Sequence, residues 1–218
     1  MDLRRHMELF NPEEFKTPVT IIGAGATGSF VAYQLAKMGI EDITVYDFDK
    51  VEPHNVPNQL FGLKDVGMQK VVALAGKIFD DTGIAINIHD EKFTTQRLAG
   101  VVIMQVDSMS ERSRIFNQHI FMKPQVKHVI DSRMGLDMGR IYNINPVDMK
   151  ESKRYQDSLY GDEESEVSAC GASMTVITSA MNIASIVARQ VINWHNEVDL
   201  NNEIMVDYLY NQIITNNC

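Results

Sequence analysis

The sequence predicts an α/β fold: a Rossmann-like, mostly parallel sheet with helices on both faces and antiparallel strands in its C-terminal third. Three observations support this prediction. A glycine-rich turn joins a short apolar strand at 19–22 to an amphipathic helix. A continuous apolar run at 101–106 is typical of a strand buried on both faces of a parallel sheet. A further strand at 126–131 is followed by a returning strand at 140–144.

The glycine turn is the first sign of a nucleotide site. Gly23, Gly25 and Gly28 follow the G-x-G-x-x-G spacing, which lets the backbone turn sharply, approach a phosphate and pack a helix against the sheet. Asp47 ends the next expected strand, 43–46, at the distance from the turn where an acidic side chain meets a ribose hydroxyl. This context favours a nucleotide site over a glycine turn that serves packing only.

A row of polar side chains beyond Asp47 argues against a dehydrogenase. It holds a second carboxylate, three carboxamides and a lysine: Asp49, Asn55, Asn58, Gln59 and Lys70. A nicotinamide enzyme has no evident use for such a row. Carboxamides and an ammonium group can hold the oxygens of a triphosphate while backbone amides at the turn neutralise the rest. We expect the Lys70 side chain at the mouth of this pocket and not in the core.

The segment resembles the adenylation domain of the ThiF/MoeB-type activating enzymes, the bacterial relatives of ubiquitin-activating enzymes. The pattern of that family is a glycine turn, then D-x-D-x-V-x-x-x-N-x-x-R-Q, then D-x-G-x-x-K. The resemblance implies that ATP is bound here, with adenosine and phosphates held by different residues: Gly25 and Asp47 for adenosine, and Asn55, Gln59 and Lys70 for the phosphates. One position departs from the pattern, because Asn58 stands where the family has arginine. A cation expected on the triphosphate is therefore missing.

Asp107 is the candidate magnesium ligand. It follows the apolar run 101–106, at the end of a central strand where doubly wound sheets bind ligands, and the resemblance implies that an aspartate here coordinates Mg²⁺. The alternative is that Asp107 or Ser108 only caps the helix that follows. The resemblance also lets Arg112 reinforce the site, although an arginine on a helix face is usually solvated.

The region after the last expected strand carries a candidate nucleophile. Residues 146–168 are polar and acidic, which predicts a long functional or disordered loop, and the resemblance places it near the adenylate and the incoming carrier tail. Cys170 then opens the expected long helix to Trp194, where a helix N-terminus lowers a thiol pKa. The resemblance makes Cys170 a candidate acyl acceptor, while the alternative is a small buried residue without chemistry. Cys218 is expected to be incidental.

The N-terminal segment suggests a second subunit in the site. Basic residues cluster at Arg4, Arg5 and His6. In the family, an arginine of this segment reaches the neighbouring subunit's site, so Arg4 or Arg5 is a candidate catalytic residue in trans and the protein is expected to be a homodimer. The alternative is a frayed, solvated terminus.

Composition limits the remaining possibilities. A length of 218 residues with 44% hydrophobic residues predicts a single adenylation domain over 1–218. The net charge of −9 argues against nucleic acid as the main partner. Two cysteines far apart cannot form the paired C-x-x-C zinc site of many relatives, so no zinc is expected. With no signal peptide or long apolar span, we expect no membrane partner and a cytoplasmic location.

The predicted reaction is ATP- and Mg²⁺-dependent adenylation of a carboxylate. The resemblance implies the C-terminal glycine of a ubiquitin-like or sulfur-carrier protein as substrate, although a small-molecule or peptide carboxylate is also compatible. Two other classes stay open. A nicotinamide-dependent oxidoreductase explains the turn and Asp47 but not Asn55, Gln59 and Lys70. A non-catalytic ATP-binding partner is motivated by Asn58 and the absent zinc cysteines.

Overall fold

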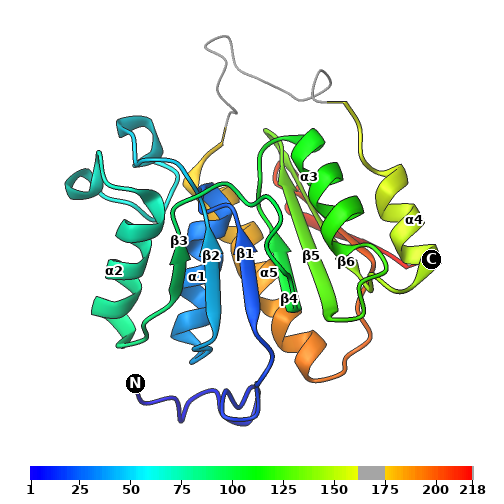
Figure 1. Cartoon of the computed structure of the whole chain (residues 1–218), viewed down its shortest axis with the longest axis horizontal. Coiled ribbons are helices and arrows are strands. Elements are labelled where there is room, and N and C mark those ends of the chain that lie inside the picture. The colour runs from blue at the N-terminus through cyan, green and yellow to red at the C-terminus, as the bar shows by residue number, and fades with distance from the viewer. Residues whose placement is uncertain (162–174, 218) are drawn as a thin grey trace.

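The computed structural model describes residues 1–161 and 175–217, which contain one eight-stranded sheet of order β3-β2-β1-β4-β5-β6-β7-β8 (Figure 1). The first five strands in this order run parallel, and the last three are antiparallel to their neighbours. The bounds are β1 Val19–Ile22, β2 Ile43–Tyr46, β3 Asn87–His89, β4 Gly100–Met104, β5 Val126–Met134, β6 Met138–Ile144, β7 Glu203–Asp207 and β8 Gln212–Asn216. The predicted fold class is confirmed.

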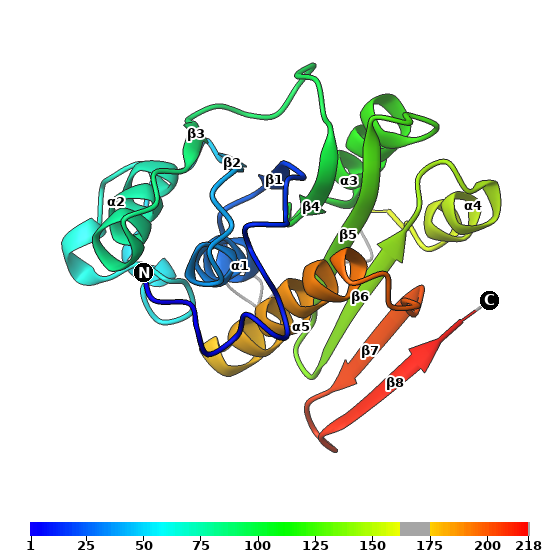
Figure 2. The same ribbon diagram turned by 90° about the horizontal axis from the view of Figure 1, so that it is seen from below.

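Helices cover both faces of this sheet (Figure 2). One face packs against three helices: α1 (Ala26–Lys37), α2 (Lys70–Thr82) and α5 (Ile177–His195). The other face packs against α3 (Met109–Ile115), the π-helical turn Phe116–Ile120 and α4 (Met149–Asp157). Alternate strand residues divide between the two apolar clusters: Ile21, Val45 and Ile103 join the first, whereas Ile22, Tyr46 and Met104 join the second. The central strands are therefore apolar throughout.

The strand order reverses at the carboxyl ends of β1 and β4, where a ligand crevice is expected in such a sheet. The chain leaves β1 for α1 and β2 on one side, whereas β4 and β5 lie on the other. Such a reversal of strand order is where open α/β sheets bind their ligands. The register pairs Ile22 with Tyr46 and with Met104, so the segments after these three strands start at one level of the sheet.

Some expected boundaries were right and others were wrong. The strands at 19–22 and 43–46 are found as expected. The apolar run 101–106 leaves the sheet after Met104, because Gln105 and Val106 already form the loop before α3. The prediction of an unstructured 146–168 was wrong in its first part, since α4 occupies 149–157. Asp148 caps that helix by accepting hydrogen bonds from the backbone N–H groups of Lys150 and Glu151.

Candidate nucleotide-binding site

Two of the three glycines in the turn are required by the packing of the protein itself. Gly23 has φ of +101°, a conformation that other residues rarely adopt. A Cβ atom on Gly23 would lie 2.5 Å from the carbonyl oxygen of Gln105, and one on Gly28 would overlap the carbonyl oxygen of Gly23. These two glycines therefore let the turn, α1 and the end of β4 approach one another closely.

Gly25 differs from the other two, because no packing contact requires a glycine there. Its φ of −79° and ψ of −145° lie outside the α and β regions, but a Cβ atom would meet nothing within 4 Å beyond its chain neighbours. The open space adjoins the N-terminus of α1, where backbone N–H groups lack helical partners and attract anions. This free space fits the phosphate or sugar that the glycine pattern predicts.

Asp47 ties the glycine turn to the end of β2. One carboxylate oxygen accepts the backbone N–H of Ala24 at 2.6 Å, and the other accepts the backbone N–H of Asp49 at 2.9 Å. Burial raises the pKa of Asp47, while these hydrogen bonds and the ammonium group of Lys70 act in the opposite direction. Each oxygen keeps a second lone pair, so a ribose hydroxyl can still donate to Asp47.

Lys70 and Asp49 form an ion pair beside this turn. The Nζ atom of Lys70 lies 2.8 Å from the Oδ2 atom of Asp49, and the backbone N–H of Lys70 donates to the Asp49 carbonyl at 2.9 Å. The Lys70 side chain is only 8% exposed, so the expectation that it lies outside the core was wrong. Its first helical position in α2 places it at the base of the crevice, where Asp49, half exposed, neutralises its charge.

The three carboxamides lie on the segment that leads from β2 to α2. The side-chain oxygen of Asn55 accepts the backbone N–H of Glu52 at 2.9 Å and so shapes the short 3₁₀ turn Pro53–Asn55. The backbone N–H of Leu60 donates to the Ser29 hydroxyl at 3.2 Å, which brings the segment against the first turns of α1. Gln59, the residue directly before Leu60, is therefore brought beside the first turns of α1.

Two of these carboxamides bury an oxygen that no described residue pairs with. They are the Oδ1 atom of Asn58 and the Oε1 atom of Gln59. The nitrogen of the Asn58 side chain donates to the Thr175 hydroxyl at 2.5 Å. Buried polar atoms are rarely left without a partner, and such exceptions are expected where a ligand supplies one.

Asp107 is exposed in the loop between β4 and α3. The backbone N–H of Gln105 donates to the Ile22 carbonyl at 2.8 Å, so this loop begins directly beside the glycine turn. Ser108, not Asp107, caps α3, because its hydroxyl accepts the backbone N–H of Glu111 at 3.2 Å. The carboxylate of Asp107 is thus not used as a cap. A single exposed carboxylate beside a phosphate site suits Mg²⁺, which takes one or two carboxylates and completes its shell with water and phosphates.

Sequence reasoning missed several polar residues next to this loop. The Ser132 hydroxyl on β5 donates to the Oε1 atom of Gln105 at 2.7 Å, and the Nε2 atom of Gln105 is buried without a partner among the described residues. Arg112 was expected to be solvated if it served no site, yet it is 5% exposed and paired with Asp131. No local sequence pattern marks such pairs, because the two residues of each pair lie far apart in the sequence on different structural elements.

The remaining predicted site residues are not brought into this crevice. Leu3 packs against Gly39 beyond the C-terminal end of α1, and the side chain of Asn196 donates to the Leu9 carbonyl at 2.9 Å. The segment with Arg4 and Arg5 therefore lies near the C-terminal end of α1, a helix about 18 Å long whose other end adjoins the turn. The nucleophile prediction falls on Cys170, which, like Cys218, lies outside the described residues.

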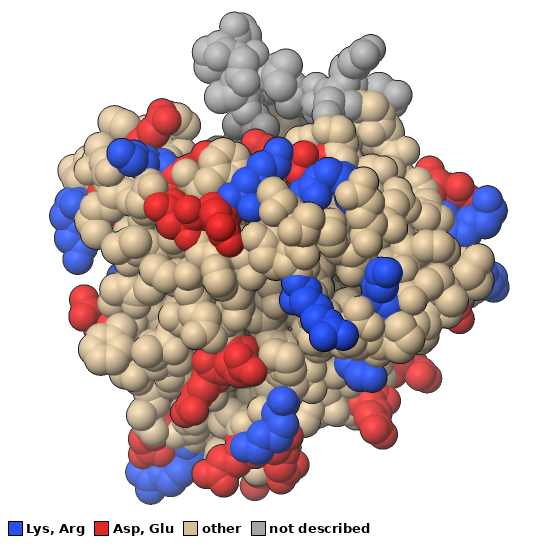
Figure 3. All heavy atoms as spheres, in the orientation of Figure 1, with Lys and Arg blue, Asp and Glu red and all other residues tan. Residues whose placement is uncertain are grey.

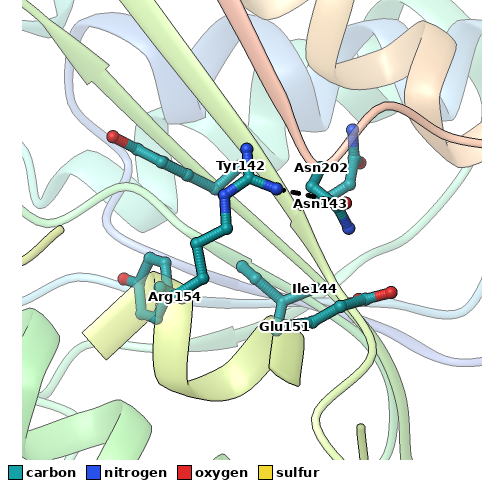
Figure 4. A pocket seen from close by; sticks show the side chains of 7 residues that line it. Tyr142, Asn143, Ile144, Glu151, Arg154 and Asn202 are labelled. Atoms are coloured by element: carbon teal, nitrogen blue, oxygen red, sulfur yellow. Dashed lines mark hydrogen bonds between the residues drawn. The ribbon is translucent and has the colours of Figure 1, made fainter. Parts of the chain in front are cut away.

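A second hollow in the structure does not compete as a nucleotide site. It lies between α4 and β6, where Arg154 reaches across to the side-chain oxygen of Asn202 at 3.2 Å (Figure 4). Its lining includes Tyr142 and Glu151 but no residue of the glycine turn. It admits little more than a water molecule, whereas pockets for ligands of nucleotide size are of the order of 300 Å³ or more.

A parallel sheet with a glycine turn at its crossover point, an acid after β2 and polar residues around an open crevice define a Rossmann-like nucleotide-binding domain. The profile of the ThiF family matches residues 15–217, and the chain belongs to that family. This confirms the resemblance seen in the sequence.

Relatives with curated descriptions match parts of the chain. Over 120 residues it is 28% identical to ubiquitin-like modifier-activating enzyme 5 of Drosophila simulans and of Drosophila melanogaster. The aligned residues make up 55% of this chain and 29% of each relative. Over 56 residues it is 43% identical to the uncharacterized protein y4oA of Sinorhizobium fredii, which is 26% of this chain and 9% of that protein. The matches thus span less than a third of these relatives.

Solved structures share the fold over nearly the whole chain. The structure of E. coli MccB with ATP superposes with a TM-score of 0.77 at 17% identity, covering 98% of this chain and 70% of that one. The structure of PaaA superposes with a TM-score of 0.73 at 19% identity, covering 94% of this chain and 65% of that one. At these identities the likeness shows a common fold.

Two further features of the described residues concern surface charge and the hydropathy of the helices. On the face in Figure 3, acidic and basic side chains are interspersed, with no continuous basic area among the described residues of that face. Within 1–161 and 175–217, none of the helices has the length and apolar character needed to cross a membrane.

Proposed function

We propose that this chain binds ATP with Mg²⁺ and adenylates a carboxylate. Two observations carry the proposal: the open space at Gly25 beside the N-terminus of α1, and the buried oxygens of Asn58 and Gln59, which have no partner among the described residues. The glycine is not needed for packing, and the unpartnered atoms await hydrogen-bonding groups. The unpartnered atoms are oxygens that can only accept, so they suit donors such as the ribose hydroxyls or the adenine amino group, whereas the space beside the N-terminus of α1 suits a phosphate.

The roles of the residues follow from their positions. The backbone at Gly25 and the N-terminus of α1 hold phosphate oxygens, and Asp47 accepts a ribose hydroxyl with its spare lone pairs. Lys70 supplies positive charge from the base of the crevice, and Asp107 would hold Mg²⁺, which neutralises charge on the phosphates. The amide nitrogens of Asn55 and Gln59 donate to phosphate oxygens along the same wall.

The proposed step is a displacement at the α-phosphorus. An oxygen of the substrate carboxylate forms a bond to the α-phosphorus, and the bond from that phosphorus to the oxygen bridging the α- and β-phosphates breaks. Pyrophosphate leaves with the electron pair, and an acyl-adenylate remains. No proton moves in this step, so positioning and charge stabilisation are sufficient and no general base is required.

The substrate we propose is the C-terminal glycine of a ubiquitin-like or sulfur-carrier protein. Support comes from family membership and from the partial match to ubiquitin-like modifier-activating enzyme 5. A peptide carboxylate is the second candidate, because the ThiF-like structures of E. coli MccB include one with MccA. In both cases Cys170 is a proposed acyl acceptor. A homodimer would bring Arg5 of one copy to the other's crevice.

Pyrophosphate exchange into ATP tests the proposal. Peptides that end in Gly-Gly with a free carboxylate should support exchange, whereas the same peptides with an amidated C-terminus should not. Lys70→Met should remove the activity. If the protein binds ATP-Mg²⁺ but no peptide or carrier carboxylate supports exchange, the chain is a non-catalytic nucleotide-binding partner and the adenylation proposal is wrong.

A further inference from the structure

A fully buried carboxylate on β5 has no role in the site described so far. Asp131 is 0% exposed and pairs in register with Met104, the last residue of β4. It therefore lies at the level where β4 passes into the loop that carries Asp107. A buried carboxylate is costly unless it is paired and hydrogen-bonded, so its partners show what it holds in place.

Asp131 has three partners on three different elements. Its Oδ1 atom pairs with the Nη1 atom of Arg112 on α3. Its Oδ2 atom accepts from the Nε atom of Arg133 at 3.0 Å and from the hydroxyl of Tyr155 on α4 at 3.0 Å. Burial raises the pKa of Tyr155, so its hydroxyl remains a donor. One side chain thus joins β5 to α3 and α4.

Arg112 connects Asp131 to the loop that carries Asp107. Its second Nη atom donates to the carbonyl oxygen of Val106, the residue directly before Asp107. Burial lowers the pKa of Arg112 to about 10, which leaves it protonated near neutral pH, and the nearby Asp107 carboxylate favours that charge. A guanidinium group with two directed hydrogen bonds fixes the distance between β5 and the loop more rigidly than an apolar contact would.

The cluster holds more positive than negative charge. Two guanidinium groups, of Arg112 and Arg133, share the single carboxylate of Asp131, and both arginine side chains are less than 10% exposed. Through Arg112 and the Val106 carbonyl, the cluster therefore holds the backbone directly before Asp107.

We propose that Asp131 is a positioning residue for the metal and triphosphate site: it fixes Arg112, and Arg112 fixes the Val106–Ser108 loop so that Asp107 faces the crevice. This inference rests on the proposed function, because it assigns Asp107 to the metal. It differs from a simple stabilising role, since a buried ion pair often contributes no more to stability than apolar residues of the same size. What it supplies is geometry, as partners of metal ligands commonly do.

The first arm of the test needs no ligand. Hydrogen exchange of the full-length protein is compared with that of Asp131→Asn, which keeps the size of the side chain and removes its charge. Exchange at the amides of 105–109 should accelerate in the variant, while the amides of β1 and β2 stay protected. Unchanged exchange in 105–109 would overturn the proposal, whatever the protein binds.

The second arm measures metal dependence by thermal stabilisation with ATP at increasing Mg²⁺, and with AMP in the absence of metal. Asp131→Asn should raise the Mg²⁺ concentration for half of the effect about tenfold, as expected for a lost partner of a metal ligand, and leave stabilisation by AMP unchanged. Asn143→Ala is the matched control. It removes a buried hydrogen-bonding residue from neighbouring β6 and should lower the melting temperature without changing the Mg²⁺ requirement.

The outcomes separate the two proposals. If Asp131→Asn loosens the loop but the wild-type protein shows no Mg²⁺-dependent binding of ATP, Asp131 still fixes the Val106–Ser108 loop, whereas the assignment of that loop to a metal fails together with the proposed function. If Asp131→Asn does not fold, Tyr155→Phe replaces it, because that change removes one hydrogen bond and keeps both ion pairs. Tyr155→Phe should shift the Mg²⁺ requirement in the same direction by a smaller amount. An unchanged Mg²⁺ requirement would overturn the proposal.

Discussion

Buried polar side chains are arranged differently around the glycine turn and in the adjoining core of β5 and β6. Near the turn, Asn58, Gln59 and Gln105 each bury a polar atom that has no partner among the described residues. In the core, Asp131 holds three partners, and Asn143 contacts His128, Gln190 and the carbonyl of Asn201. In the first region three side chains each have an unpaired buried atom, whereas Asp131 and Asn143 in the second are paired within the protein; the Nε atom of Arg112 is the exception among the side chains named there.

This difference follows from the cost of burying polar atoms. A buried donor or acceptor without a partner costs about 1–3 kcal/mol, so a protein keeps such atoms mainly where a ligand relieves the cost. The region around the turn should therefore gain stability from a nucleotide. Substitutions there should change binding, whereas substitutions in the β5–β6 core should change folding.

The glycines provide the largest expected effect and test the comparison inside the turn. Gly28→Ala should destabilise the protein by about 3 kcal/mol or more, because the new methyl group overlaps the Gly23 carbonyl and backbone cannot easily move aside. Gly25→Ala places its methyl group against no neighbouring atoms, so it should cost clearly less stability than Gly28→Ala, and it should weaken ATP binding. Urea unfolding and ATP titration measure both. If both variants lose the same stability, the distinction between Gly28 as a packing glycine and Gly25 as a ligand-site glycine would be wrong.

The β5–β6 core predicts a pH dependence of stability that is independent of ligand. Burial lowers the pKa of His128 from the ordinary 6.5 to about 4, against the hydrogen bond with Asn143. Between pH 6.5 and about 4, His128 is therefore protonated in the unfolded chain but stays neutral in the folded protein. Stability is full above pH 6.5 and falls as the pH drops toward 4, by about 3 kcal/mol in total.

Urea unfolding between pH 4 and 7.5 measures this effect, with His128→Gln as the variant that removes the titrating group. The variant is less stable at pH 7.5 but should lose less with falling pH than wild type. A parallel decline of both proteins would assign the pH dependence to other groups.

Lys70 tests the link between the turn and the triphosphate. Lys70→Met keeps much of the buried stem and removes the charge, so ATP binding should weaken at least tenfold, as expected for a lost charged hydrogen bond of about 1.5 kcal/mol or more. The half-exposed partner Asp49 can turn to water, which limits the stability loss to about 1 kcal/mol. Lys50→Met, at an exposed lysine nearby, is the control. ATP affinity retained by Lys70→Met would contradict the phosphate assignment.

Asn58 gives the smallest expected effect. Asn58→Arg should raise the adenylation rate about tenfold, because one charged hydrogen bond to the triphosphate contributes at least about 1.5 kcal/mol. The change also removes the contact between Asn58 and Thr175, so Thr175→Ala serves as the control for that loss. If the rate is unchanged or lower while ATP binding is intact, the view that Asn58 merely lacks the charge of the family's arginine would be wrong.

Local patterns predicted the turn region well, because its rules act within a few residues. The strands at 19–22 and 43–46 are apolar runs that end at turn-forming residues, and their bounds were correct. Helix α4 was missed because its sequence is polar and it buries few side chains; Tyr155 is one of these. Its only clear signal was Asp148 followed three residues later by Glu151, a pattern typical of a helix start.

The parts that the sequence could not predict depend on contacts between distant residues. Asp131 and Arg112 lie 19 residues apart in the chain, and neither belongs to a pattern that indicates pairing or burial. Lys70 was placed at the pocket mouth because lysines are usually exposed, but the fold brings Asp49 to it and makes burial tolerable. Pairing of buried charges is a property of the assembled sheet.

Thermal stabilisation by nucleotides tests most directly whether the crevice at Gly25 is a triphosphate site. The wild-type protein is heated with ATP-Mg²⁺, AMP, NAD or NADH, alongside Gly25→Ala. ATP-Mg²⁺ at 100 times its dissociation constant should add about 2.7 kcal/mol, or roughly 5–10 °C in melting temperature, and the shift should be lost in Gly25→Ala. A shift with NAD or NADH and none with ATP-Mg²⁺ would contradict the account and make the site that of an oxidoreductase.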